Sequence, residues 1–328
     1  MIRRFSLTVN TCAFIRLICW LASLVTFASA EEARRPRVTG IAHAAFYVDD
    51  MKEAVAFYTE FLGYEVPYTL PLPSGGELVW IKINDRQSVE LFPGAAVAKG
   101  SDRLSHIAIE TDDADAMRLY LQAKGFKVPD KTPVGKSGNK NFTISDPDGN
   151  RVEIVEYLPT GWTAREIGKF QSGPRVSTKL RHVGVKVGDL DSAMAFYGEV
   201  LGFKEIYRQS ADGNVLSWVN MQAPDGDEYI EFMLYDQAPG APQLLSMHHI
   251  CLEVEDILQT HRVLQGRPLP KSCKHPTGMK LGKNGRWQIN CFDPDGSRVE
   301  VMEPDTFNGE PIPPSPAPPP GTKARVKT

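Results

Sequence analysis

The sequence predicts an α+β fold in which four βαβββ modules form two tandem domains with cupped mixed sheets. The first observation is a long repeat: the stretch SDPDGNRVEIVEY from Ser145 returns as FDPDGSRVEVMEP from Phe292. The second is that HAAFYVDDMKEAVAFYTEFLG from His43 returns as HVGVKVGDLDSAMAFYGEVLG from His182. The third is that each copy divides again into two similar halves. Self-similarity at a nearly constant offset indicates a duplicated architecture.

The first half of each copy is expected to begin with a strand and a helix. In the first copy the helix covers 51–63, and its apolar residues recur at the spacing of one helical face. Asp50 followed by Glu53 resembles an acidic capping box, and Gly63 is a natural helix stop. The strands of this half are expected at 41–48, 78–83 and 88–92.

The second half repeats this order, with a helix that stops at Gly125. The turn DPDG between its last two strands contains a proline, which sets φ, and a glycine, which supplies a positive φ, so it predicts a hairpin. The expected elements are a strand at 105–110, a helix at 114–124 and strands near 141–145 and 151–157. The second copy repeats both halves.

The chain divides into six predicted regions. They are a signal peptide (1–30), an N-terminal extension (31–37), a first domain (38–158), a linker (159–178), a second domain (179–304) and a proline-rich tail (305–328). The tail is so dense in proline that we expect it to be extended and disordered.

The first 30 residues have the composition of a secretory signal peptide. Arg3 and Arg4 form a basic start, an apolar stretch follows over 17–30, and the stretch ends on the small residues ASA. The apolar stretch is shorter than the roughly 20 residues that span a bilayer. We therefore expect a secreted or periplasmic protein with no membrane attachment after cleavage. A retained anchor is the alternative.

Charge and cysteine content limit the possible partners. The chain has 37 Lys and Arg against 40 Asp and Glu, and removal of the three leader arginines leaves 34 against 40. This acidic balance argues against nucleic acid and anionic membranes, so the expected partner is a small-molecule substrate. Cys251, Cys273 and Cys291 remain, an odd number that predicts packed residues rather than a disulfide framework. The expected state is a monomer with pseudo-dimeric domains or a homodimer.

Each module carries a histidine on its first strand and a glutamate on its last strand. The histidines are His43, His106, His182 and His249, and the glutamates are Glu90, Glu153, Glu231 and Glu300. Alternation along a strand puts these residues on one face, so two histidines and two glutamates converge where two modules form a cup. Imidazole and carboxylate with open water positions suit a divalent metal: Ni, Zn, Mn or Fe(II).

A structural interpretation competes with the metal site. A histidine in a strand is usually a hydrogen-bonded core residue, and a glutamate in a strand usually faces water. Burying four glutamates without neutralising partners is costly, however, which favours the metal. The sequence leaves open whether the modules pair within a copy or across the two copies.

The motifs AFY-x-x-x-LG, SHIAIE and DPDG-x-x-VE resemble those of the vicinal-oxygen-chelate superfamily, over residues 38–158 and 179–304. That superfamily includes glyoxalase I, methylmalonyl-CoA epimerase, extradiol dioxygenases and bleomycin resistance proteins. The resemblance implies two tandem glyoxalase-like domains, each with a metal site.

The pattern is most similar to glyoxalase I. This resemblance implies that Glu153 and Glu300 are the catalytic proton-transfer bases, and that the metal polarises a substrate oxygen and stabilises the enediolate. We therefore predict a metal-dependent lyase or isomerase that acts next to a carbonyl of a small organic substrate. Glyoxalase I grips glutathione with an Arg and an Asn, where this chain has Tyr47 or Lys186 and Gly94 or Tyr235. These differences disfavour glutathione.

Two other functions remain as alternatives. One is an extradiol ring-cleaving dioxygenase, although the tyrosine expected for it is replaced by Thr143 or Asn290. The other is a metal-free binding or resistance protein. Alternation places further side chains on the ligand faces, and the ones expected to contact substrate are Tyr47, Phe92, Lys186 and Tyr229.

Overall fold

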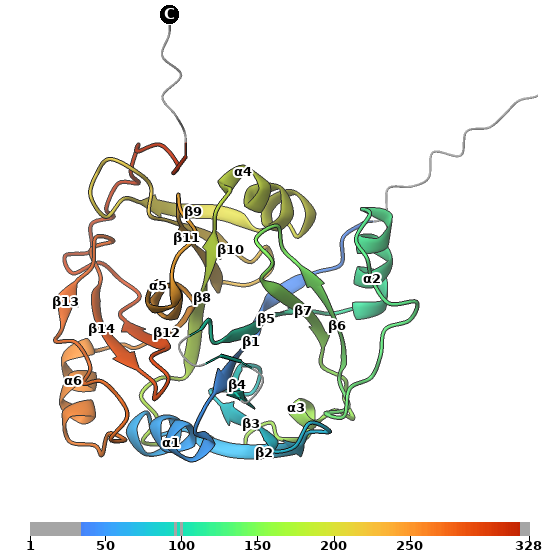
Figure 1. The fold of residues 1–328 in the computed structure, drawn as a ribbon, viewed down its shortest axis with the longest axis horizontal. Helices are drawn as coiled ribbons and strands as arrows, with labels where there is room; N and C mark the ends of the chain where they lie inside the picture. The colour runs from blue at the N-terminus through green and yellow to red at the C-terminus, as the bar shows by residue number, and fades with distance from the viewer. Residues whose placement is uncertain (1–33, 95–96, 99–100, 322–328) are drawn as a thin grey trace, which may run out of the picture. The chain divides into compact units, whose positions relative to one another are not determined.

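The computed structural model describes residues 34–94, 97–98 and 101–321, so the predicted signal peptide lies outside the described residues. The described chain forms two mixed sheets (Figure 1). The first has the strand order β2-β3-β4-β1-β5-β7-β6, and the second has the order β13-β14-β15-β12-β8-β11-β10-β9. The α+β class with two cupped, tandem sheets is therefore confirmed.

The elements follow the predicted order. The first copy contains β1 (Val38–Val48), α1 (Met51–Ala56), the π-helical turn η1 (Phe57–Phe61), β2 (Glu65–Pro71), β3 (Glu77–Lys82), β4 (Ser88–Pro93), β5 (Leu104–Thr111), α2 (Ala114–Ala123), β6 (Lys140–Ser145) and β7 (Arg151–Glu156). The short helix α3 (Trp162–Arg165) follows. The second copy contains β8 (Lys179–Val187), α4 (Leu190–Ala193), η3 (Met194–Val200), β9 (Lys204–Gln209), β10 (Trp218–Gln222), β11 (Tyr229–Leu234), α5 (Ala241–Met247), β12 (His249–Glu253), α6 (Ile257–Gln265), β13 (Lys280–Leu281), β14 (Trp287–Phe292) and β15 (Arg298–Met302).

The local signals for the first helix and the hairpin turn are confirmed. The Asp50 carboxylate caps α1 by accepting a hydrogen bond from the backbone N–H of Glu53 at 3.1 Å. Gly63 has φ +85° and ends the helix, as only glycine does without strain. Gly149 and Gly296 supply the positive φ in the two DPDG turns.

Strand pairing decides how the modules combine. β1 is parallel to β4 and antiparallel to β5, and β5 is parallel to β7. β8 pairs in the same way with β11 and β12, and β12 with β15. The four central strands of each sheet therefore come from one copy, so each cup is built within one copy.

The second and fourth modules are less complete than the predicted βαβββ unit. After α2 the first of the three expected strands is reduced to a single bridge between Val134 and Lys140, and after α6 it is the two-residue β13. The segments before the Val134 bridge and before β13 are rich in proline, including Pro129, Pro133 and Pro270. Proline has no N–H to donate to a neighbouring strand, which shortens the pairing.

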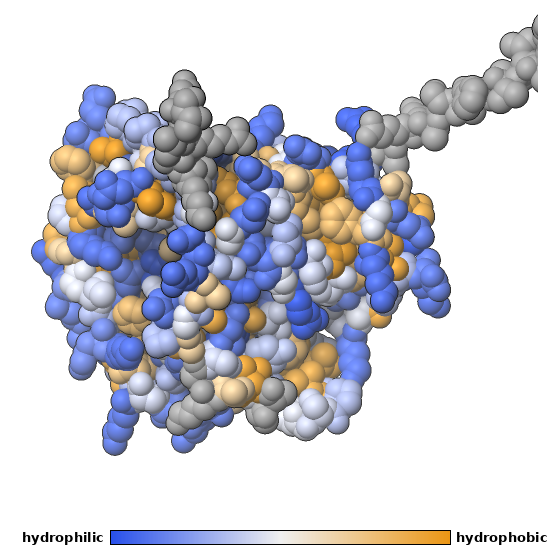
Figure 2. Space-filling model, turned by 45° about the horizontal axis from the view of Figure 1, so that its top comes forward, coloured by the Kyte–Doolittle hydropathy of each residue, from blue (hydrophilic) through white to orange (hydrophobic). Residues whose placement is uncertain are grey.

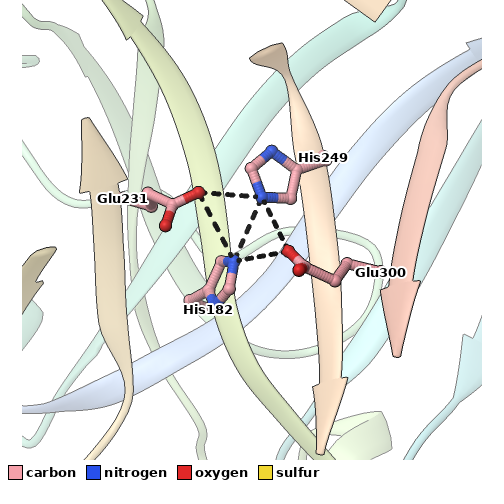
Figure 3. A group of neighbouring side chains, drawn as sticks. All are labelled: His182, Glu231, His249 and Glu300. Carbon is pink, nitrogen blue, oxygen red and sulfur yellow. Dashed lines mark hydrogen bonds and ion pairs between the residues drawn. The ribbon is translucent and has the colours of Figure 1, made fainter. Parts of the chain in front are cut away.

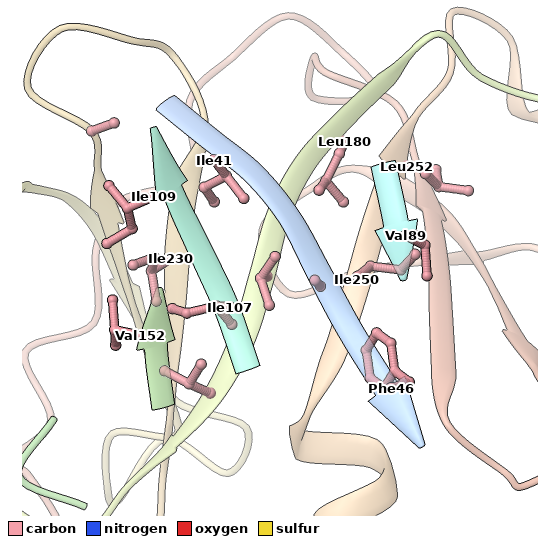
Figure 4. Close-up of a cluster of buried hydrophobic side chains, with 14 of the residues drawn as sticks. Ile41, Phe46, Val89, Ile107, Ile109, Val152, Leu180, Ile230, Ile250 and Leu252 are labelled. Carbon is pink, nitrogen blue, oxygen red and sulfur yellow. The ribbon is translucent and has the colours of Figure 1, made fainter. Parts of the chain in front are cut away.

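The faces of the sheets turned away from the cups share one hydrophobic cluster. It joins Ile41, Phe46 and Ile107 of the first sheet to Leu180 and Ile250 of the second (Figure 4). Alternation along β1 sends Ala44 and Phe46 into this cluster and leaves His43 for the cup. The floor of each cup therefore rests on a packed layer.

Each DPDG turn also docks on the other copy. The Asp146 carboxylate accepts a hydrogen bond from the Tyr197 hydroxyl at 3.0 Å, and the Asn150 amide donates to the Lys186 carbonyl at 3.0 Å. The other turn is held in return, because Asp295 accepts a hydrogen bond from the Asp49 backbone N–H at 3.1 Å. The two copies are thus fastened by polar contacts around their hydrophobic contact.

The tail is more ordered than the sequence predicts, and the predicted linker packs on the first copy. Trp162 in the linker packs against Trp80, with ring centroids 5.7 Å apart. The prediction of disorder is wrong for residues 305–321, which pack on the second copy. The Pro318 carbonyl accepts from the Leu216 N–H at 2.9 Å, and Ala317 is buried. An extended proline-rich backbone keeps its carbonyls free, so it can pair in this way.

The outer surface is mixed in character. On the face shown in Figure 2, hydrophobic and hydrophilic side chains are interspersed. Among the described residues, no helix has both the length and the apolar character needed to cross a bilayer. Cys251, Cys273 and Cys291 are free thiols.

Candidate metal centres

The first cup brings together His43 from β1, Glu90 from β4 and His106 from β5. The Nε2 atoms of the two histidines are 3.1 Å apart, and Oε1 of Glu90 lies 3.5 Å from Nε2 of His43. One donor atom of each residue lies within 4.8 Å of the others, and all three residues are buried. The arrangement can hold a divalent ion with three protein ligands.

Glu153 from β7 stands at the edge of this group. Its Oε2 lies 3.3 Å from Nε2 of His106, but its carboxylate does not join the three residues whose donor atoms are all within 4.8 Å. The side chain is also 14% exposed, more than the 8% of Glu90. Glu153 therefore has more access to the cavity than the other three residues.

The second cup gathers all four of its predicted residues. His182, Glu231, His249 and Glu300 point toward one another from β8, β11, β12 and β15 (Figure 3). The histidine Nε2 atoms are 3.0 Å apart, and the Oε2 atoms of Glu231 and Glu300 lie 3.3 and 3.7 Å from Nε2 of His249. The structure thus brings seven of the eight side chains together in two groups, with Glu153 at the edge of the first.

Small residues form the floor of each cup. Ala45 is paired with Glu90 on one side and His106 on the other, and Gly184 is paired with Glu231 and His249. A β-carbon added at Gly184 would lie 2.1 Å from Nδ1 and Cε1 of His249. The imidazole of His249 therefore occupies the space that the missing side chain leaves.

Gly184→Ala should displace His249 and weaken metal binding in the second cup. We expect a loss of about tenfold to 100-fold in affinity, the range seen when the support of a metal-binding histidine is disturbed. The measurement is a calorimetric titration of the chelator-treated protein with Zn²⁺. Ala45→Gly is the matched control, since it only removes a methyl group from the first cup. Equal affinities for Gly184→Ala and wild type would contradict the packing argument.

Burial dominates the electrostatics of the first cup. It lowers the pKa of His106 to about 3, with help from Arg151, and burial and His106 lower the pKa of His43 well below its usual range. Burial and Glu153 raise the pKa of Glu90 well above its usual range. Burial raises the pKa of Glu153 to about 7, against the opposing effect of Arg151. Without a cation, this cup therefore favours neutral forms.

The second cup favours charged carboxylates instead. Burial works to raise the pKa of Glu300, but the hydrogen bond from His182 and the Arg298 guanidinium outweigh it and lower the pKa to about 2. Burial likewise opposes ionisation of Glu231, yet His182 and His249 lower its pKa. Burial and Arg298 lower the pKa of His249 to about 4. The two cups share a fold but differ in charge balance.

Glu153→Gln and Glu300→Gln should change the stability of the metal-free protein in opposite directions. The raised pKa of Glu153 stabilises the fold below pH 4.5, and this contribution is lost as the pH rises to about 7. The lowered pKa of Glu300 stabilises the fold above pH 4.5, and this contribution is lost as the pH falls toward 2. At pH 8, Glu153→Gln should therefore unfold at a higher urea concentration than wild type, and Glu300→Gln at a lower one. Each change corresponds to up to about 3 kcal/mol in the free energy of unfolding. Shifts in the same direction would contradict the assigned pKa values.

The cavities above the two groups differ in character. The first has a volume of about 170 Å³, and the second about 270 Å³. Apolar and aromatic side chains line one part of the first, namely Leu70, Leu78, Trp80, Phe92, Val155 and Tyr157, and polar side chains such as Lys136, Asn139 and Asn141 line the rest. Cationic and sulfur-bearing side chains line the second, among them Lys280, Lys283, Arg298, Met233 and Met302.

The residues predicted to contact substrate have different positions. Phe92 lines the first cavity. Tyr47 lies behind Phe92, with the two ring centroids 6.0 Å apart, and does not line the cavity. Lys186 does not line the second cavity, because its ammonium donates to the Asp148 carbonyl at 3.0 Å. Tyr229 is buried, and its ring is stacked on that of His182 with the centroids 4.6 Å apart. It therefore supports the imidazole of His182, a proposed metal ligand, and does not face the cavity.

Sequence reasoning missed several cavity residues. Arg298 stands two residues before Glu300, which puts it on the same strand face, so alternation could have identified it. Trp80 and Trp218 each face a cavity from the strand next to the glutamate strand. Asn139 and Lys283 come from loops, for which strand periodicity provides no signal.

The fold and the two His/Glu groups are those of a tandem protein of the glyoxalase type, with cups able to hold a metal ion. A family model described as "Glyoxalase/Bleomycin resistance protein/Dioxygenase superfamily" matches residues 40–154 and 179–301. The chain belongs to this superfamily.

The relatives in this superfamily are enzymes of several kinds. A putative lactoylglutathione lyase from Brassica oleracea var. gemmifera is 28% identical over 173 residues, which cover 51% of this chain and 56% of that protein. The chain thus spans about half the length of the curated lyases that it matches. Other relatives are epimerases and a dioxygenase.

Solved structures share the whole fold. The 2,3-dioxygenase LapB from Pseudomonas sp. KL28 has a TM-score of 0.64 at 18% identity, and the alignment covers 87% of this chain and 97% of LapB. The Mn(II)-bound glyoxalase from Novosphingobium aromaticivorans has a TM-score of 0.63 at 19% identity and covers 84% of each chain. At these identities the likeness establishes the fold and not the reaction.

Proposed function

We propose that the protein is a divalent-metal-dependent lyase or isomerase that moves a proton next to a carbonyl of a small organic substrate. The observation that carries this proposal is the first cup, where three donors form a compact group and a fourth carboxylate, Glu153, lies at its edge. A catalytic metal site commonly has three protein ligands and leaves a position for water or substrate.

The donor set suits such an ion. His43, Glu90 and His106 offer two imidazole nitrogens and a carboxylate, ligands that Ni, Zn, Mn and Fe(II) all accept. When bound, a divalent ion would supply Lewis-acid polarisation of a substrate oxygen. Burial raises the pKa of Glu90 and of Glu153, and a bound cation would offset the cost of ionising these two carboxylates.

Glu153 is the proposed acid–base group. A general base works best when its pKa lies near the working pH, and burial raises the pKa of Glu153 to about 7 in the absence of an ion. Glu153 would remove a proton from the substrate carbon and return it to the neighbouring carbon or to the opposite face. Trp80, Phe92 and Tyr157 would hold the apolar part of the substrate and keep water out.

Elemental analysis and two assays test the proposal. Purified protein should contain at least one divalent ion per chain and convert 2-oxoaldehyde–thiol adducts, or exchange the proton next to a carbonyl in D₂O. Oxygen consumption with catechols in the presence of Fe(II) would support the dioxygenase alternative. That activity is disfavoured, since His43 and His106 are the histidines that line the described first cavity, and neither is spare for acid–base work. Absence of any ion under all loading conditions would refute both activities.

We further propose that the protein acts outside the cytoplasm, which the composition of residues 1–30 supports. Expression of the full chain followed by N-terminal sequencing of the exported fraction tests this, and the expected new N-terminus is Glu31. A protein that stays in the cytosolic fraction with residues 1–30 still attached would contradict the proposed export.

A further inference from the structure

A guanidinium group lies inside the second cup. Arg298 on β15 places Nη2 2.9 Å from Nε2 and 2.8 Å from Nδ1 of His249, and its Nη1 lies 3.7 Å from Oε2 of Glu300. A cation of the chain itself therefore touches two of the four proposed ligands.

The guanidinium lies against the imidazole that would offer its lone pair to a metal. Nδ1 of His249 is 2.8 Å from the Met247 carbonyl oxygen, which can only accept, so Nδ1 carries the proton and Nε2 carries the lone pair. Nη2 of Arg298 is almost equally far from both ring nitrogens, so it lies over the face of the imidazole, beside Nε2 and out of line with its lone pair. A metal ion bound at Nε2 would therefore sit next to a fixed positive charge.

Neighbouring groups hold Arg298 in this position. Its Nε donates to the Ser246 carbonyl at the end of α5 at 2.9 Å, and its Nη1 lies 3.4 Å from Oδ1 of Asn290. The side chain is only 13% exposed. Moving it out of the cup would break these contacts.

Among the described residues of the first cup, no cation makes a hydrogen bond or ion pair with a proposed ligand. Arg151 occupies the equivalent position, two residues before Glu153, but it is exposed and makes no ion pair with Glu153 or hydrogen bond to His106 among the described contacts. His106 is held at Nδ1 by the Ser105 hydroxyl at 3.2 Å, and its Nε2 faces His43. No guanidinium lies against this imidazole among the described contacts.

We propose that the two cups are unequal: the first binds the divalent ion and carries the chemistry, and Arg298 is a built-in counter-cation that weakens metal binding in the second. The inference rests on the proposed metal-dependent function and decides which copy performs it. A guanidinium a few ångströms from a divalent ion repels it strongly in a buried site, so an ion enters only when Arg298 leaves. The second cup should bind metal at least tenfold more weakly than the first.

Mn²⁺ titration of the chelator-treated full chain, with free Mn²⁺ followed by its electron paramagnetic resonance signal, tests the proposal. Wild type should show one tight and one weak class of site. Arg298→Gln should tighten the weak class at least tenfold, while the matched variant Arg151→Gln should leave the weak class unchanged. His43→Ala should remove the tight class, and His182→Ala should remove the weak one. These last two variants test the assignment even if Arg298→Gln fails to fold.

Several outcomes would overturn the inference. They are two equal sites in wild type, no tightening in folded Arg298→Gln, and loss of the tight class in His182→Ala. Each of these leaves the proposed metal-dependent function standing. A wild-type protein that binds no Mn²⁺ at all would instead refute the proposed function, and the inference with it.

Discussion

Glu153→Gln should lower kcat by about 10²-fold to 10⁴-fold, the usual contribution of a positioned acid–base group. A glutamine amide cannot take a proton from carbon, whereas His43, Glu90 and His106 remain to hold the ion. The loss should therefore appear in kcat, or in the rate of proton exchange in D₂O, with the metal content unchanged. Both quantities can be measured on the same metal-loaded preparation.

Glu156→Gln is the matched control for this experiment. It makes the same chemical change three residues along β7, where the carboxylate accepts a hydrogen bond from the Ala114 N–H at 2.9 Å outside the cup. Its activity should stay within about threefold of wild type. Glu300→Gln should cost less activity than Glu153→Gln if the first cup performs the chemistry. Full activity in Glu153→Gln would show that another group moves the proton.

The sequence was sufficient to predict the fold class and to locate the eight histidines and glutamates. The reason is that both depend on local rules: a repeated motif marks equivalent positions, and strand alternation determines which of them share a face. Asp50 and the DPDG turns were predictable for the same reason, since a cap or a tight turn depends on a few neighbouring residues.

The differences between the cups were not predictable in this way. Whether an arginine enters the cup depends on what else can bind it, and Arg298 is held by Ser246, 52 residues away. Lys186 faces the cup by alternation, yet it bonds to the turn of the other copy because β8 ends there. Trp162 and Pro318 join the packed structure through segments without periodicity. These features come from long-range contacts, which one sequence does not reveal.

The contact between the copies should be the most sensitive part of the fold. Arg103 is 2% exposed and binds both oxygens of Asp49 at 2.8 and 2.9 Å, and it also reaches Asp295 of the second DPDG turn at 3.2 Å. Arg103→Ala would leave two carboxylates facing each other without their shared cation. Asp49 is 38% exposed and can turn to water, but Asp295 is 5% exposed and would lose its partner. We therefore expect a loss of about 3 kcal/mol in the free energy of unfolding by urea, the lower end of the range for a broken buried ion pair.

Arg37→Ala provides the comparison for Arg103→Ala. Arg37 is also paired with an aspartate, Asp225, at 3.7 Å, but its side chain is 62% exposed, so water and salt screen the pair. Its removal should cost less than about 1 kcal/mol. If Arg103→Ala proved equally mild, the two aspartates must find other partners, and the DPDG turn would not depend on Arg103. If the loss is as large as expected, raising the pH from 4 to 7 should increase it, because burial raises the pKa of Asp295 and its carboxylate becomes charged as the pH rises.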